Sequence, residues 1–127
     1  MRAVLEICHG GPSDPAVQAL AQATWLLKVD PGRIPAKVAA FRLSNGESAV
    51  LAHALANPGN GVIIDDQAAR SAAAALGIPH QGTLGVVVFA KAQGFIPAAR
   101  PVVEQLRQHG MYLSDQVMNQ ALAQVGE

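Results

Sequence analysis

Two adjacent carboxylates, Asp65 and Asp66, follow the apolar run "GVII" and precede the helix-forming run "QAARSAAAAL". Carboxylate oxygens suit Mg²⁺ or Mn²⁺. Two negative charges about 4 Å apart repel by about 4 kcal/mol at an effective dielectric of 20, so a cluster of carboxylates requires a cation. A local role is the alternative, in which Asp66 stabilises the following helix as its N-cap by about 1 kcal/mol and Asp65 is solvated. These two residues alone favour the local role.

Two glutamates are further candidates for an acidic site. Glu47 begins the helical pattern "ESAVLAHALA", where a carboxylate also interacts favourably with the helix dipole. It approaches Asp65 only if that helix starts at the carboxyl edge of a sheet. Glu6 lies in the apolar segment "AVLEICHGG", which is an unusual place for a charge, although a partly exposed helix position also accounts for it.

Other kinds of catalytic site are not indicated. The four histidines lack metal-ligand spacing, and we expect His53 at the edge of a core. No serine lies in a nucleophile elbow, and the stretches "HGGPSD" and "NPGNG" lack the lysine and the glycine order of phosphate-binding loops. Arg70, one turn beyond the aspartates, is within reach of a phosphate near them, but a solvated helix arginine is the simpler interpretation.

The composition limits the class of protein. Half of the 127 residues are hydrophobic, only 14% are charged, and the formal net charge is zero. The high apolar and low charged fractions predict apolar surface for a partner subunit, and hence a homo-oligomer. The zero net charge excludes a positive potential over the whole molecule, although a local basic patch is compatible with it. The single Cys8 excludes an intramolecular disulfide and a cysteine zinc cluster. Because no leader and no membrane-length apolar stretch is present, we expect a cytoplasmic protein with no membrane partner.

The length and the pattern of the chain predict one domain in which helices alternate with short strands. Cap residues and apolar spacing place helices within residues 13–24, 43–61, 67–77, 83–94, 97–110 and 114–126. Strands are expected at residues 25–29, 61–65 and 78–80, with residues 111–113 as a further candidate and residues 33–42 as a loop containing a helical turn. The run "VVVF" within residues 83–94 suggests a strand, but the spacing of Leu84, Val87, Val88 and Lys91 favours a helix. Such alternation predicts a small parallel sheet, and ligand sites of these sheets lie beyond the carboxyl ends of the strands, where Asp65 and Asp66 stand.

The last two-thirds of the chain carries an ordered set of short motifs. These are "GES" at the start of a helix, "DDQAAR", "GTLG" and the "AK..G.I" spacing after it, while "AVLEICHGG" is similar to a family segment that carries a glutamate in a helix. In this order they resemble a prokaryotic family of PIN-like domains, described as nucleic-acid-binding proteins and related to VapC-type toxin ribonucleases. The resemblance implies a three-layer α/β/α fold with a short, mostly parallel sheet, and it implies a helix at "TLGVVVFAKAQ".

The resemblance also implies a site of about four acids that binds Mg²⁺ or Mn²⁺ and hydrolyses phosphodiester bonds of RNA or DNA. By position, Glu6, Glu47 and Asp66 match the second, third and fourth of these acids, which are catalytic metal ligands, and Asp65 lies beside them. The candidate contacts to the nucleic acid are Arg70, Thr83 and Lys91.

One departure from the family concerns the start of the chain. The family's first strand, which ends in the first aspartate, and its first helices have no counterpart, so we expect an N-terminally truncated domain with a weakened site and an open sheet edge. Three hypotheses follow. The first is a metal-dependent nuclease of toxin–antitoxin type, bound by an antitoxin or completed by another chain or an upstream segment. The second is a non-catalytic remnant that dimerises or binds nucleic acid, and the third is an unrelated small α/β protein whose acids are helix caps.

Overall fold

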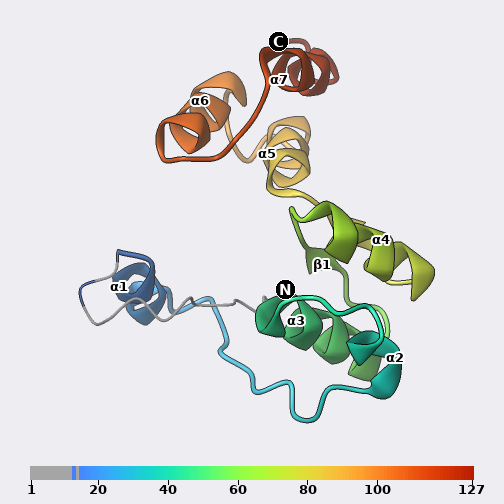
Figure 1. The fold of residues 1–127 in the computed structure, drawn as a ribbon. Coiled ribbons are helices and arrows are strands. Elements are labelled where there is room, and N and C mark those ends of the chain that lie inside the picture. Colours follow the sequence, from blue (N-terminus) through green and yellow to red (C-terminus); the bar gives the residue numbers. More distant parts are fainter. Residues whose placement is uncertain (1–12, 14) are drawn as a thin grey trace. The chain divides into compact units, whose positions relative to one another are not determined.

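The computed structural model describes residue 13 and residues 15–127 (Figure 1). The described chain contains helices and one short sheet, in the order α1 (Pro15–Gln22), α2 (Ala36–Ala39), α3 (Asn45–Ala56), β1 (Val62–Ile63), α4 (Gln67–Ala75), β2 (His80–Gln81), α5 (Thr83–Ala92), α6 (Arg100–Gln108) and α7 (Asp115–Ala123). It divides into two compact units, Met1–His80 and Gln81–Glu127. None of the described helices is long and apolar enough to cross a membrane.

The core of the first unit joins α2, α3, β1 and α4. Leu51 of α3 and Val38 of α2 are fully buried, and Ala69, Ala72 and Ala73 present a face of small side chains from α4. An apolar stripe on α3 faces this cluster, because Leu51 and Ala54 are buried while Val50 and Leu55 pack against it. Burying a leucine or valine side chain stabilises the fold by about 1.5–3 kcal/mol, so this stripe fixes α3 and with it the position of Glu47.

The sheet is parallel and consists of β1 and β2. The Val62 amide donates to the Pro79 carbonyl oxygen at 2.8 Å. Gly61 permits this approach, since a Cβ at that position would lie 3.1 Å from the same carbonyl oxygen. The strand β1 is therefore shorter than the strand expected at residues 61–65, and Asp65 and Asp66 follow it after Ile64.

The second unit is a small helical assembly of α5, α6 and α7. Its buried core consists of Val87, Ala99, Val103, Met118 and Leu122. The prediction of a helix at residues 83–94 is confirmed by α5, because Val87 faces this core although the run "VVVF" has strand propensity. Gly82 occupies the N-cap position of this helix.

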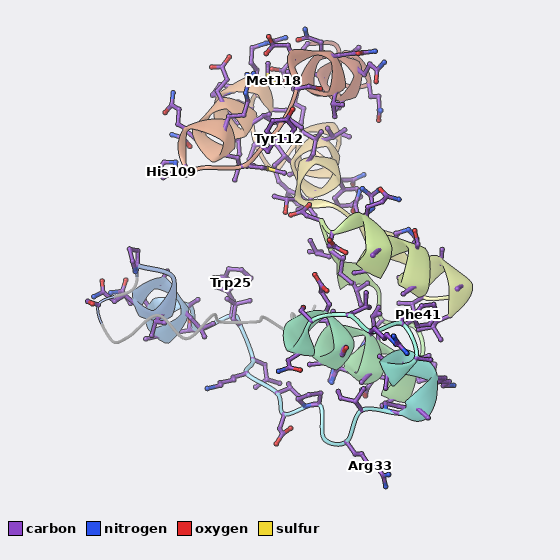
Figure 2. All side chains as sticks on the ribbon, in the orientation of Figure 1. Trp25, Arg33, Phe41, His109, Tyr112 and Met118 are labelled. Atoms are coloured by element: carbon purple, nitrogen blue, oxygen red, sulfur yellow. The ribbon has the colours of Figure 1, made fainter. Side chains whose placement is uncertain are left out.

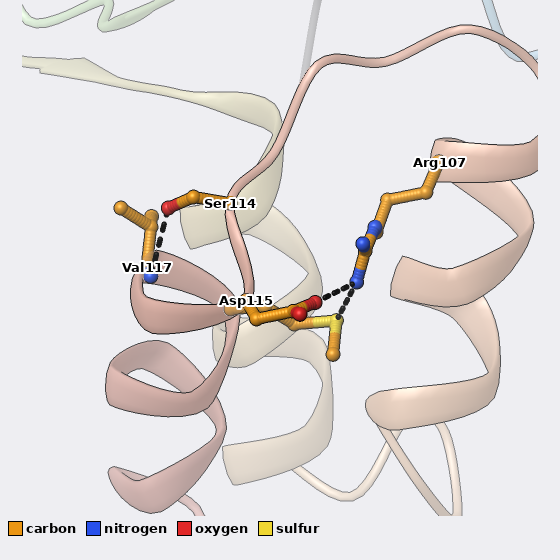
Figure 3. Close-up of polar contacts among 5 residues, drawn as sticks. Arg107, Ser114, Asp115 and Val117 are labelled. Carbon is orange, nitrogen blue, oxygen red and sulfur yellow. Dashed lines mark hydrogen bonds and ion pairs between the residues drawn. The ribbon is translucent and has the colours of Figure 1, made fainter.

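Polar contacts join the elements of the second unit. Arg107 on α6 donates to the Asp115 carboxylate at 2.8 Å and to the Met118 sulfur at 3.4 Å, which links α6 to α7 (Figure 3). Ser114 begins α7, since its hydroxyl oxygen accepts from the Val117 amide at 3.2 Å (Figure 3). The Glu127 carboxylate accepts from the Ala99 amide at 2.7 Å and from the Arg100 amide at 3.1 Å, which caps the start of α6.

Two predicted strands are wrong. Residues 25–29 and residues 111–113 adopt no regular structure, and Trp25 and Tyr112 are 75% and 95% exposed. The run "WLLKV" has the composition of a strand, but strand propensity expresses packing against a neighbouring strand, and the only sheet among the described residues is β1–β2. The α/β class is confirmed and is consistent with a PIN-like fold. The three-layer arrangement, the single domain and the truncation stay predictions.

Candidate functional site

Asp66 lies at the junction of β1 and α4 and begins that helix. Its Oδ2 atom accepts from the Ala69 amide at 2.9 Å, and its backbone carbonyl accepts from the Arg70 amide at 2.9 Å. The cap residue has the extended backbone expected of an N-cap, with φ −64° and ψ 130°. The side chain is exposed, and within the described chain its other oxygen accepts no hydrogen bond. The local role is therefore realised, and one carboxylate oxygen is left for a further ligand.

Glu47 has a comparable position at the start of α3. Its Oε2 atom accepts from the Ser44 amide at 3.1 Å, while the Ser44 hydroxyl accepts from the Glu47 amide at 3.3 Å. This reciprocal pair is a capping box, and it satisfies two of the amides that a helix start leaves without a partner. The side chain is half-buried, so its direction is fixed both by packing and by the cap. Like Asp66, Glu47 has one oxygen that accepts no hydrogen bond from the described residues.

The described acids alone do not complete a metal site. Across residues 13 and 15–127, no three His, Cys, Asp or Glu side chains lie where they can hold one metal ion. Asp65 is exposed and engaged in an interaction of its own, adjacent to the cap formed by Asp66. Glu6, the predicted second acid, lies outside the described residues. Glu47, Asp65 and Asp66 thus supply oxygen donors of the type that Mg²⁺ prefers, but not a full set.

The predicted nucleic-acid contacts lie on different helices. Arg70 is half-buried on α4, and its guanidinium makes no ion pair or hydrogen bond to the described residues. Thr83 is the first residue of α5 and is already engaged in an interaction. The Lys91 ammonium donates to the Pro97 carbonyl oxygen at 2.7 Å, which ties the end of α5 to the loop after it. The Lys91 side chain thus has a hydrogen-bond partner within the protein, whereas the Arg70 guanidinium has none among the described residues.

The sequence interpretation missed a run of cations between α1 and α3. Four of the nine Lys and Arg residues fall within residues 28–42, and all four are exposed: Lys28, Arg33, Lys37 and Arg42. None of these side chains makes an ion pair or hydrogen bond to a described residue. The sequence already contains this local density of positive charge, but the net charge of zero, taken over the whole chain, does not reveal it.

A sequence comparison decides the family. The model of the PIN domain family matches residues 3–127, which is nearly the whole chain. The chain belongs to the PIN domain family. Comparison of this PIN domain with curated proteins and with solved structures found no match. The family suggests a function of the nuclease type, and PIN domains are generally dependent on divalent metal ions.

Proposed function

We propose that this PIN domain hydrolyses phosphodiester bonds of RNA or DNA in the presence of Mg²⁺ or Mn²⁺, using Glu6, Glu47 and Asp66 as its acids. The observation that carries the proposal is the family match over residues 3–127. The positions of Glu47 and Asp66 support it, because each carboxylate is held by a helix-start hydrogen bond through one oxygen and leaves the other available.

The caps give these two carboxylates a defined task in the proposed site. An N-cap hydrogen bond fixes the side-chain rotamer, so the second oxygen points in one direction without a further loss of side-chain entropy. Exposure of Asp66 leaves it open to a ligand from solvent. Because the described residues do not bring three acids together, the proposal requires another carboxylate, for which Glu6 is the candidate. A toxin role, an antitoxin partner, a homo-oligomer and a cytoplasmic location stay predictions from the sequence.

A second candidate function is a nucleic-acid-binding module without catalysis. The specific observation in its favour is that both Glu47 and Asp66 already have structural partners, since each accepts the amide of a helix start. Acids that serve only as caps require no metal. The two functions differ in one measurable property, which is cleavage of a bound strand.

The deciding experiment measures cleavage and metal binding on the same protein. Fluorescently labelled single-stranded RNA and DNA oligonucleotides are incubated with the full chain and millimolar Mn²⁺ or Mg²⁺, with a chelator as the reference. We expect cleavage with metal only, and we expect Mn²⁺ to raise the melting temperature of the wild type. In Asp66→Asn the rise in melting temperature should be lost. The cleavage rate should fall by more than about 100-fold, because mutation of a residue that only supports a metal ligand already costs about 10–100-fold in activity.

Asn is the matched substitution because it caps a helix about as well as Asp while it carries no charge. A fall in activity in this variant is therefore not a consequence of an unfolded α4. Cleavage that persists in Asp66→Asn would contradict the assigned role of Asp66. Absence both of cleavage and of any melting shift at millimolar metal would contradict the nuclease and leave the binding module.

A further inference from the structure

The segment at residues 25–42 exposes both positive charge and aromatic surface. Trp25 and Phe41 are 75% and 38% exposed, and between and beside them lie the exposed cations described above. The Arg33 side chain extends outward from the chain (Figure 2). The single acid of this stretch, Asp30, is occupied locally, because its Oδ1 atom accepts from the Gly32 amide at 2.9 Å.

The cations of the second unit provide the contrast. Each of the three in Gln81–Glu127 donates to a protein oxygen: Lys91 to Pro97 at 2.7 Å, Arg100 to Glu127 at 3.3 Å, and Arg107 to Asp115 at 2.8 Å. In residues 25–42 no cation has such an acceptor among the described residues. The Lys and Arg side chains without a hydrogen-bond or ion-pair partner among the described residues are therefore the four of this segment, with Arg70 of α4 as the one addition.

We propose that residues 25–42 form a binding track for single-stranded nucleic acid, in which the cations contact phosphates and the two aromatic side chains stack on bases. The track is defined as Trp25, Lys28, Arg33, Lys37, Phe41 and Arg42. This inference rests on the proposed function for its choice of a polyanionic ligand and adds the surface that holds it. The four cations recur at intervals of four or five residues, so the positive charge is spread along the whole segment, and proteins commonly bind the backbone of a single strand through such an extended basic surface.

The aromatic side chains favour a single strand over a duplex. Stacking requires the face of an unpaired base, whereas the bases of a duplex already stack on each other. Trp25 and Phe41 are not part of the described core. Their exposed ring surfaces are therefore available for stacking on a base. A track made of cations alone would bind either form through the phosphates.

Arg42 adds a second observation about this segment. It is the only described residue other than glycine with a positive φ, at 53°. Glycine adopts this conformation without a steric penalty, while an arginine does not. A strained cation at the end of α2 is consistent with a residue kept for its side chain rather than for its backbone.

The test measures binding in a chelator, where hydrolysis does not interfere. Labelled single-stranded RNA, single-stranded DNA and a duplex of the same sequence are titrated with the full chain by fluorescence anisotropy at several salt concentrations. We expect tighter binding to one or both single strands than to the duplex. Arg33→Gln and Lys37→Gln should each make the salt dependence weaker. The magnitude of the negative slope of log K against log salt should fall by about 0.7, the value for one phosphate contact on a single strand.

Matched controls separate the track from charge and aromaticity in general. Arg107→Gln removes the same unit of charge from a cation that already has a protein acceptor, so its salt slope should stay unchanged. Trp25→Ala should weaken single-strand binding about 5- to 10-fold, and Trp25→Phe should restore most of it. Tyr112→Ala removes an exposed aromatic outside the track and should have no effect. Equal effects of the track and control variants would overturn the proposal.

Failure of this inference is distinguishable from failure of the proposed function. Metal-dependent cleavage that is unaffected by the track variants would overturn the track and leave the nuclease. Track-dependent binding without cleavage supports the track and contradicts the nuclease. Binding to vesicles that contain phosphatidylserine, or to poly-glutamate, with the same dependence on Arg33 and Lys37 but without binding to either single strand, would overturn the choice of ligand.

Discussion

The Asp66 carboxylate and the Ala69 amide form the hydrogen bond that begins α4, with Oδ2 at 2.9 Å from the amide nitrogen. The same side chain is thus a helix cap and one of the acids of the proposed site. Asp66→Ala should lower the free energy of unfolding by about 1 kcal/mol because the cap is lost, whereas Asp66→Asn should change it by a few tenths only. Both variants should lose cleavage. Urea denaturation beside the cleavage assay measures the two effects, and an intact cleavage rate in either variant would remove Asp66 from the site.

Glu47 allows the same separation on α3. Glutamine can replace glutamate in a capping box, so Glu47→Gln should keep the stability of the wild type, while Glu47→Ala should lower it by about 0.5–1 kcal/mol. If Glu47 binds metal, both variants should also reduce the Mn²⁺-induced rise in melting temperature. Thermal denaturation with and without Mn²⁺ provides both readouts. A full metal-induced shift in Glu47→Gln would show that Glu47 is a cap alone.

The sequence could predict the helix caps, but it could not predict which of the capping acids belong to a site. Glu47 and Asp66 were expected at helix starts, and both lie there, each accepting from an amide three residues away, because capping depends on residues only three positions apart. Whether an acid also belongs to a site depends on which other carboxylates approach it in space. Helix caps and metal sites use the same residue types, so local spacing could not decide between them.

Long-range partners account for the other differences. The α5 helix was predictable because apolar spacing outweighs the strand propensity of three consecutive valines once Val87 has a core to face. The strand expected at residues 25–29 depends on a neighbouring strand, which a local pattern does not reveal. The cap that Glu127 provides to Ala99 joins residues 28 positions apart and left no signal in the sequence.

The Glu127 carboxylate makes the stability of α6 dependent on pH. The amides of Ala99 and then of Arg100 lower the pKa of this carboxyl from its usual 4.5. Because the folded-state pKa lies below the unfolded value, the ionised carboxylate stabilises the helix start above pH 4.5, and this contribution is lost as the pH falls through the lowered pKa. Hydrogen-exchange protection of the Ala99 and Arg100 amides should therefore fall below pH 4.5. Glu127→Gln should show reduced protection at neutral pH and little further change on acidification. Equal profiles for the two proteins would contradict the cap.

Arg42 should show opposite effects on stability and on binding. Its φ of 53° is strained for an arginine, so Arg42→Gly should raise the free energy of unfolding by about 0.5–1 kcal/mol as the strain is relieved. The same substitution removes a cation of the track and should lower the salt slope of single-strand binding by about 0.7.

Arg42→Ala is the matched control, since it removes the charge but keeps a Cβ in the strained conformation. It should weaken binding as much as Arg42→Gly does without the gain in stability. Urea denaturation followed by the far-ultraviolet circular dichroism of the helices measures the stability of each variant. A stabilised Arg42→Gly that binds single strands as well as the wild type would show that the arginine is not retained for nucleic acid, because glycine would then be the better residue on every measured property.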